Sequence, residues 1–432
     1  MKEDLIKSLI LEFQNSPLLE VQQRRLETPL NTGKILTIIG PRRAGKTAYC
    51  FGLIRKLLES GRSAEQILYI NFEDERLDRT TQELDLIVQV YQREYPDHDL
   101  SSCVFVFDEI QNVPNWDRFV RRMYDTVCKN LIITGSNSKV LSKDIATSLR
   151  GRTLTYEILP LSFREYLSFL KVSSVPKTGK DAALVQLHLE NYLVYGGFPE
   201  IVGFENSLKI KTLQEYFEVM MYRDVGDRAG IGDSGLLRFF LKKSFASATK
   251  VYSVNKMFND LKTAGYKIGK NTLYEIANLC KDAYLFFTVP KFTRKIATQE
   301  LGDKKLFAID QGLLVALGLV MPDEKGKLME QAVFLELYRR ARGNVHFDAN
   351  GYECDFLLGE WDQIRAAVQV TVSLEDADVK KRELRGLLSA CEKFGLSEGL
   401  IITYSEKDKL VTRGVSITVL PLWEWLLISD DR

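Results

Sequence analysis

One stretch near the amino terminus constrains this chain more than any other. An apolar, β-branched run over residues 35–39 stops at Gly40, and residues 40–47 then read GPRRAGKT. Glycines at both ends of such a loop let its backbone N–H groups turn inward, toward phosphate oxygens at the start of the following helix. The sequence therefore predicts a phosphate-binding loop made of Gly40, Pro41, Arg42, Arg43, Ala44, Gly45, Lys46 and Thr47.

The last two residues of this loop indicate ATP and Mg²⁺ as the ligands. Lys46 can reach the β- and γ-phosphates, and Thr47 can place its hydroxyl on the metal. The alternative is a surface loop that contains a lysine and binds no nucleotide, but it does not explain why Gly40 and Gly45 are glycines.

The charge and cysteine content narrow the class of protein. The 432 residues include 59 Lys or Arg and 58 Asp or Glu, so any nucleic-acid surface must be local. The six cysteines show no C-x-x-C spacing, and no apolar run reaches 18 residues. We expect a cytoplasmic protein that has no membrane partner.

Five short apolar runs alternate with amphipathic stretches. This pattern predicts an α/β fold with a mainly parallel sheet flanked by helices. A lead-in helix is expected over residues 2–25, from the helical spacing of apolar side chains. The five runs cover residues 35–39, 67–72, 104–107, 131–134 and 153–158.

Two acids end the third run and form a Walker B pattern. Asp108 is expected to hold Mg²⁺ through water, and Glu109 to polarise the attacking water. An acid after the aspartate favours hydrolysis over mere binding of ATP.

Polar residues after the fourth run complete the predicted catalytic set. Ser136 or Asn137 can sense the γ-phosphate, or can cap a helix over 139–149. Arg150 and Arg152 can stabilise phosphate charge in this chain or in a neighbouring subunit of a homo-oligomer, and solvated surface positions are the alternative.

The order of these motifs resembles the AAA+ superfamily of P-loop ATPases. The phrases LRGRTLTYEILPLSFREYL, YLVYGGFPE, YRDVGD and KLFAIDQGLL further resemble prokaryotic AAA-type ATPases with a DUF4143-like, nuclease-like carboxyl-terminal domain. The resemblance implies an ATPase core with strand order 5-1-4-3-2, a helical lid, a winged helix and a degenerate endonuclease fold. We expect an N-terminal helix at 1–25, the ATPase core at 26–160, the lid at 161–230, the winged helix at 231–320 and the nuclease-like domain at 321–432.

A basic segment follows the expected lid. Helices are predicted over 236–245, after Ser253, and after Asn271 or Thr272, with strands over 284–289 and 305–309, which is the order of a winged helix-turn-helix. Between Lys242 and Lys305 there are 13 Lys or Arg and 5 Asp or Glu, which favours DNA contact, although winged helices also bind proteins. The expected DNA-contacting residues are Lys267, Lys270, Asn271, Tyr274, Lys291, Arg294 and Lys295.

From residue 328 the predicted order α-β-β-β-α-β resembles the PD-(D/E)xK, or restriction-endonuclease-like, fold. Such enzymes use a helix glutamate and a strand aspartate, here Glu330 or Glu336 and Asp355. On the third strand, however, Gln369 replaces the metal-binding acid and Thr371 replaces the lysine. Lys380 and Lys381 lie nearby on the next helix, and borrowing from there would be unusual, so we expect a vestigial nuclease site.

These features are compatible with three alternative functions. The first is a Mg²⁺-dependent, ATP-hydrolysing AAA+ protein whose nucleotide state controls DNA or partner binding. The second is a non-motor signalling or scaffold ATPase that acts on a protein partner. The third is a metal-dependent DNA nuclease.

Overall fold

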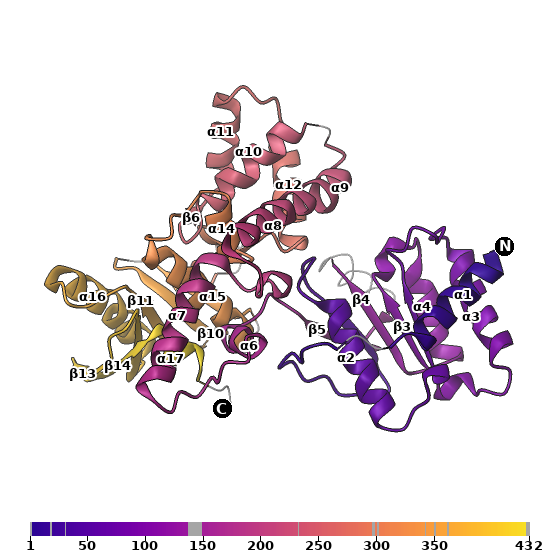
Figure 1. Ribbon diagram of the computed structural model, residues 1–432. Coiled ribbons are helices and arrows are strands. Elements are labelled where there is room, and N and C mark those ends of the chain that lie inside the picture. The colour runs from indigo at the N-terminus through magenta and orange to yellow at the C-terminus, as the bar shows by residue number, and fades with distance from the viewer. Residues whose placement is uncertain are drawn as a thin grey trace. The chain divides into compact units, whose positions relative to one another are not determined.

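The computed structural model describes residues 2–17, 20–30, 32–136, 149–231, 233–295, 299, 302–341, 343–349, 351–360 and 363–428. The chain divides into two compact units, Met1–Leu159 and Pro160–Lys281 with Leu285–Arg432 (Figure 1). In the described parts, no helix combines the length and the hydropathy that crossing a membrane would require.

The first unit is built on a parallel sheet of five strands. Their order is β2-β3-β4-β1-β5, which confirms the parallel sheet and the strand order that the resemblance implied. Each strand coincides with one of the five apolar runs to within one residue. The bounds are β1 (Ile35–Ile39), β2 (Ile67–Asn71), β3 (Val104–Asp108), β4 (Leu131–Gly135) and β5 (Thr153–Glu157).

Helices cover both faces of this sheet (Figure 1). Helix α2 (Lys46–Glu59) packs on one face, and α3 (Thr81–Glu94) and α4 (Trp116–Thr126) pack on the other. Because both faces are covered, β1, β3 and β4 are buried along their whole length, as continuous apolar runs require. Short 3₁₀ turns join the elements at Ala64–Gln66, Leu100–Ser102 and Ile110–Asn112.

The amino-terminal helix is shorter than predicted. Helix α1 spans Lys2–Asn15 rather than residues 2–25, because Pro17 lacks a backbone N–H and disfavours helical geometry at Ser16. It packs against α3 and the edge strand β2, with Ile6 and Ile10 buried in the core on the α3 side.

The second unit begins with helices and a small antiparallel sheet of order β6-β8-β7. The third helix of its basic segment begins at Lys270, so the predicted caps Asn271 and Thr272 lie within its first turn. The Leu273 N–H donates to the Gly269 carbonyl, so the helix begins two or three residues earlier than expected. The elements are α6 (Phe163–Phe169), α7 (Gly179–Tyr195), a 3₁₀ turn (Pro199–Ile201), α8 (Asn206–Val219), a π-helical turn (Met220–Gly226), α9 (Asp227–Ala229), α10 (Ser234–Phe245), β6 (Val251–Tyr252), α11 (Val254–Thr263), α12 (Lys270–Asp282), β7 (Phe286–Pro290), β8 (Lys304–Ala308) and α14 (Gln311–Ala316).

A mixed six-stranded sheet ends the chain, in the order β13-β14-β12-β11-β10-β9. Strands β11, β12 and β14 run parallel to one another, and the remaining pairs are antiparallel. Strand β13 was not predicted from the sequence. The elements are α15 (Lys325–Ala341), β9 (Val345–Asp348), β10 (Cys354–Glu360), β11 (Gln363–Val370), α16 (Ala377–Phe394), β12 (Glu398–Thr403), β13 (Asp408–Thr412), β14 (Val415–Pro421) and α17 (Leu422–Leu426).

Candidate functional site

The glycine-rich loop joins β1 to α2, and its two glycines have backbone geometry that other residues rarely adopt. Gly40 has φ +149°, and a Cβ there would lie 2.0 Å from the Ile158 carbonyl oxygen. Gly45 has φ +92° and stands immediately before α2. Both glycines are therefore required by the path of the chain, as the sequence led us to expect.

An arginine outside the motif holds this loop. The Arg24 guanidinium donates to the Ala44 and Leu159 carbonyl oxygens, at 2.8 Å each. Arg24 was not predicted from the sequence. It was expected to lie in the helix over residues 2–25, but in the structure it follows that helix in a stretch without regular secondary structure. Arg42, by contrast, pairs with Glu73, which follows β2.

Four side chains of the two predicted nucleotide motifs meet at the carboxyl edge of the sheet. The Thr47 hydroxyl donates to Asp108 Oδ2 at 2.7 Å. The Lys46 ammonium lies 3.1 Å from Glu109 Oε1 and 3.1 Å from the Pro41 carbonyl oxygen, and its side chain is only 5% exposed. A carboxylate and a hydroxyl side by side are the hard oxygen ligands that Mg²⁺ prefers, so this pair fits a bound metal–nucleotide.

Asp108 is held by hydroxyl groups from three elements. Besides Thr47 of α2, the Thr134 hydroxyl of β4 donates to Oδ1, and the Tyr69 hydroxyl of β2 donates to Oδ2 at 2.9 Å. Burial raises the pKa of Asp108, although the hydrogen bonds from Thr134 and Thr47 act in the opposite direction. Thr134 and Tyr69 were missed, because neither belongs to a motif.

Glu109 is placed differently from Asp108. Its Oε2 accepts hydrogen bonds from the Gln111 amide at 2.5 Å and from the Ser136 backbone N–H at 3.2 Å. Burial alone would raise the pKa of Glu109, but the Lys46 ammonium and the Gln111 amide outweigh it and hold the pKa below its usual value. The carboxylate is therefore ionised at neutral pH and able to accept a proton.

The predicted sensor is described only in part. Ser136 is buried beside Glu109, and its hydroxyl accepts a hydrogen bond from the Gln111 amide at 3.4 Å. Asn137 lies outside the described residues, as does most of the helix that was expected over 139–149.

The two arginines lie at the opposite edge of the sheet from the glycine-rich loop. Arg152 immediately precedes β5, and its carbonyl accepts from the Ile35 N–H at the start of β1. Because β1 and β5 are parallel, five residues of strand, roughly 16 Å, separate Arg152 from the phosphate loop. Arg152 pairs with Asp125, and Arg150 lies two residues further from β5. Their prediction as residues acting on this chain's own phosphates is wrong. The role in a neighbouring subunit stays a prediction, with a solvated surface position as its alternative.

A second polar cluster lies in the carboxyl-terminal unit, around Lys305 of β8. Its ammonium lies 3.1 Å from Glu330 of α15, 2.6 Å from Glu353 and 3.4 Å from Asp355 of β10. Burial would lower the pKa of Lys305, but these three carboxylates outweigh it and raise the pKa above its usual value. Sequence reasoning looked for a lysine on α16 and missed this one, because the resemblance places no functional residue on β8.

The acids of this cluster line an open cavity of about 790 Å³. Gln369 lies in its wall, where its amide donates to Glu383 at 2.5 Å and its oxygen accepts from the Asp355 N–H at 3.3 Å. Thr371 lines the same cavity. Glu336 does not join the cluster, because its carboxylate pairs with Arg339 and Arg340, which leaves Glu330 as the helix acid. Among the residues that the structure describes, no group of three or more His, Cys, Asp or Glu side chains is arranged so that it could hold a metal ion.

The predicted DNA-contacting residues lie on α12 and after β7. Lys267, Lys270, Asn271, Tyr274, Arg294 and Lys295 are exposed, and Lys291 is half-buried. Lys291 and Arg294 line a cavity of about 590 Å³ together with Lys393 of α16, whose ammonium pairs with Asp348.

The two most recognisable phrases of the second unit meet each other. The Asp310 carboxylate, fully buried, accepts from the Gly197 N–H at 2.7 Å and from the Gly312 N–H at 2.8 Å. A Cβ at Gly196 would lie 1.7 Å from Asp310 Oδ1. This contact explains the glycines of YGGFPE and IDQG as structural residues.

Comparison with known proteins gives two matching families and two long relatives. The family described as an AAA domain matches residues 32–167, and the domain of unknown function DUF8612, rather than DUF4143, matches residues 186–324. The protein MJ1544 of Methanocaldococcus jannaschii is 35% identical over 99% of this chain and 96% of its own length. A Haemophilus influenzae protein is 28% identical over 92% of this chain and 95% of its own.

Solved structures resemble the chain only loosely. The Walker-type ATPase PABY2304 of Pyrococcus abyssi aligns with a TM-score of 0.41 and 15% identity, over 67% of this chain and 91% of that one. The Aeropyrum pernix ORC1 protein, solved in complex with DNA, aligns with a TM-score of 0.30 and 12% identity, over 74% and 90%. Both scores lie below 0.5, so we infer no function from them.

Proposed function

This chain belongs to the same family as MJ1544, and its residues 32–167 match an AAA domain; on that premise we propose that it binds ATP with Mg²⁺ and hydrolyses it. The observation that supports this most directly is the meeting of Lys46, Thr47, Asp108 and Glu109 at one edge of the sheet. The two segments that supply them, at 40–47 and 108–109, are far apart in the sequence, with 61 positions between Thr47 and Asp108, so their convergence goes beyond a local match to a motif.

Each side chain has a distinct role in this proposal. Lys46 leaves Glu109 and binds the β- and γ-phosphates, while Thr47 and Asp108 supply oxygen ligands. Bound there, Mg²⁺ would neutralise charge that develops on the phosphates during transfer. Glu109, once released from Lys46, accepts a proton from the attacking water.

A phosphate-release assay tests the proposal. Lys46→Ala should abolish both ATP binding and turnover, because the loop then lacks the ammonium that is proposed to bind the β- and γ-phosphates. Lys56→Ala is the matched control, since Lys56 is an exposed lysine of the same helix. If Lys46→Ala hydrolyses ATP as fast as the control, the site is not where we place it.

We propose further that the nucleotide state controls binding by the second unit. Three helices and an antiparallel pair, β7 and β8, support a winged helix-turn-helix, and exposed basic residues on α12 and after β7 favour DNA. Fluorescence anisotropy of a labelled duplex, measured against salt with and without ATP, tests this. An absence of affinity at low salt would favour a protein partner instead.

The carboxyl-terminal sheet is proposed as a PD-(D/E)xK-like domain without nuclease activity. The supporting observation is that the Lys305 ammonium lies among Glu330, Glu353 and Asp355, where a metal ion would have to bind. Plasmid incubated with Mg²⁺ or Mn²⁺ should stay intact. Cleavage that disappears in Asp355→Ala would show that the domain is a metal-dependent nuclease after all.

A further inference from the structure

The Tyr69 side chain connects the proposed metal site to the amino-terminal helix. Tyr69 lies in the middle of the edge strand β2, and its hydroxyl donates to Asp108 Oδ2 at 2.9 Å. The Thr47 hydroxyl donates to the same oxygen at 2.7 Å, and the Thr134 hydroxyl donates to the other. Tyr69 is the member of this set that lies outside the nucleotide motifs and also contacts α1.

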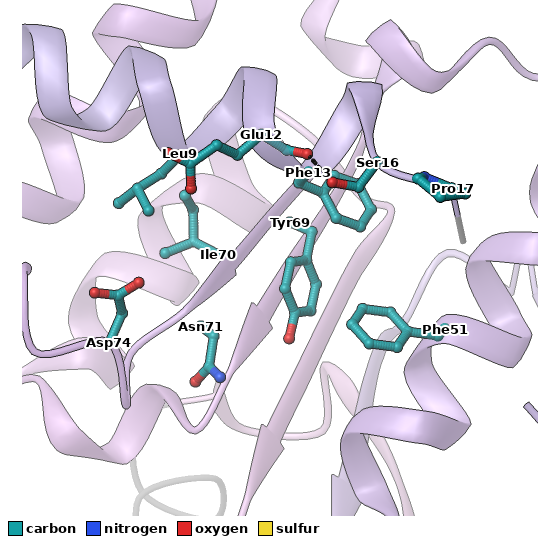
Figure 2. Close-up of a pocket in the computed structure, with 10 residues that line it drawn as sticks. All are labelled: Leu9, Glu12, Phe13, Ser16, Pro17, Phe51, Tyr69, Ile70, Asn71 and Asp74. Atoms are coloured by element: carbon teal, nitrogen blue, oxygen red, sulfur yellow. Dashed lines mark hydrogen bonds between the residues drawn. The ribbon is translucent and has the colours of Figure 1, made fainter. Parts of the chain in front are cut away.

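Aromatic rings from two helices hold the Tyr69 ring. Its centroid lies 4.9 Å from that of Phe13 in α1 and 5.1 Å from that of Phe51 in α2. Figure 2 shows the ring beside both of these side chains, with its hydroxyl directed away from α1. Aromatic packing of this kind fixes the plane of a ring, and therefore the direction of its hydroxyl.

The ring is not fully enclosed. A cavity of about 270 Å³ lies beside it, lined on one side by α1 residues including Leu9 and Phe13 and on the other by Tyr69 and Phe51 (Figure 2). A Tyr69 ring that lost its contact with Phe13 would therefore have room to shift.

The Tyr69 hydroxyl acts as a hydrogen-bond donor to Asp108. The phenol is the donor in this contact, because an ionised carboxylate has no proton to give. A phenol that always donates fixes the rotation of the carboxylate it contacts. Asp108 then presents its remaining lone pairs in one direction, toward Thr47 and the phosphate loop.

We propose that Tyr69 is a positioning residue for the metal–nucleotide, whose hydroxyl orients Asp108 and whose ring is held by α1 through Phe13. This inference rests on the proposed ATP site. It makes α1 a part of the nucleotide machinery, although α1 contributes no group to the phosphates.

Binding of a fluorescent ATP analogue, titrated with Mg²⁺, tests the inference without relying on turnover. Tyr69→Phe keeps the ring and removes the hydroxyl. We expect it to raise the Mg²⁺ concentration at half-saturation about tenfold, the effect of one lost hydrogen bond to a charged group. Binding measured with EDTA should not change.

Two further variants separate positioning from folding. Phe13→Leu leaves the hydroxyl in place and loosens the ring, and should shift the Mg²⁺ half-point in the same direction by about threefold. Tyr95→Phe is the matched control, because its hydroxyl donates to Gln14 of α1 and does not reach Asp108. It should titrate like the wild type.

The outcomes are distinct. A Tyr69→Phe protein with an unchanged Mg²⁺ half-point overturns the inference, as does one that loses binding equally with Mg²⁺ and with EDTA. If Tyr69→Phe does not fold, the comparison of Phe13→Leu with Tyr95→Phe decides the question by the same criterion. A wild-type protein that binds no nucleotide refutes the proposed function itself.

Discussion

The Lys46 ammonium and the Glu109 carboxylate form a buried ion pair, with Nζ 3.1 Å from Oε1. The pair joins the residue proposed to bind phosphate to the residue proposed to activate water. If ATP binds as proposed, it must take Lys46 from Glu109, and the same event would release Glu109 to accept a proton. Binding and activation would then be coupled through one contact.

Glu109→Gln should separate the two roles of this pair. Turnover should fall by at least about a hundredfold, because an amide cannot accept the proton of the attacking water. ATP affinity should be retained or increased, since Lys46 no longer has an anionic partner in the free protein. Phosphate release and equilibrium binding measure the two effects, and Glu59→Gln, at an exposed acid at the far end of α2, is the control. Near-normal turnover in Glu109→Gln would exclude Glu109 as the base.

Lys305→Met should destabilise the carboxyl-terminal unit. The variant leaves Glu330, Glu353 and Asp355 without their cation, and loss of one partner from a buried ion pair costs about 3 kcal/mol. The free energy of unfolding, measured with urea, should show this at pH 7. Lys295→Met, at an exposed lysine, should unfold like the wild type.

The deficit of the same variant should depend on pH. Burial, followed by the nearby Asp355, already raises the pKa of Glu330 to about 8, and removing Lys305 raises it further. In the wild type Glu330 therefore gives up its proton in the folded state above about pH 8, whereas in the variant it keeps a proton that the unfolded chain has lost. The deficit of Lys305→Met should therefore be larger at pH 9 than at pH 7. An equal deficit at both pH values would mean that the three acids are not what the lysine stabilises.

Asp310 should give the second unit a pH-dependent stability. Burial raises its pKa to about 7, against the hydrogen bonds from Gly197 and Gly312. Between about pH 4 and pH 7 the folded protein holds a proton that the unfolded chain has lost, so stability should fall by about 3 to 4 kcal/mol as pH rises. Asp310→Asn should be less stable at low pH, having lost an acceptor, and should lose this slope. Asp323→Asn, at an exposed aspartate, should keep it.

The parts of the site that could be predicted are those encoded within one segment. The five strands and both nucleotide motifs are local patterns, so β1, β3 and the glycine-rich loop lie where the sequence placed them. The position of Arg152 could also have been predicted. Arg152 precedes β5 and the glycine-rich loop follows β1, and in a parallel sheet the starts and the ends of the strands lie at opposite edges.

The parts that could not be predicted depend on register between segments. Tyr69 and Thr134 reach Asp108 only because β2, β3 and β4 are neighbours with a particular alignment, and neither side chain differs in type from an ordinary strand residue. Lys305 is a still clearer case. It comes from a strand of the small sheet, 50 residues before Asp355, and no spacing rule relates the two.

Arg152→Ala should leave the ATP turnover of dilute protein unchanged within about twofold. Arg152 pairs with Asp125 at the amino edge of the sheet, roughly 16 Å of strand from the phosphate loop, so it does not reach the ATP of its own chain. Turnover measured over a range of protein concentrations, with light scattering on the same samples, tests this. A defect that appears only as the chain self-associates would identify Arg152 as acting on a neighbouring subunit. A defect present at every concentration, including where light scattering finds monomer, would contradict the placement of Arg152 at the far edge.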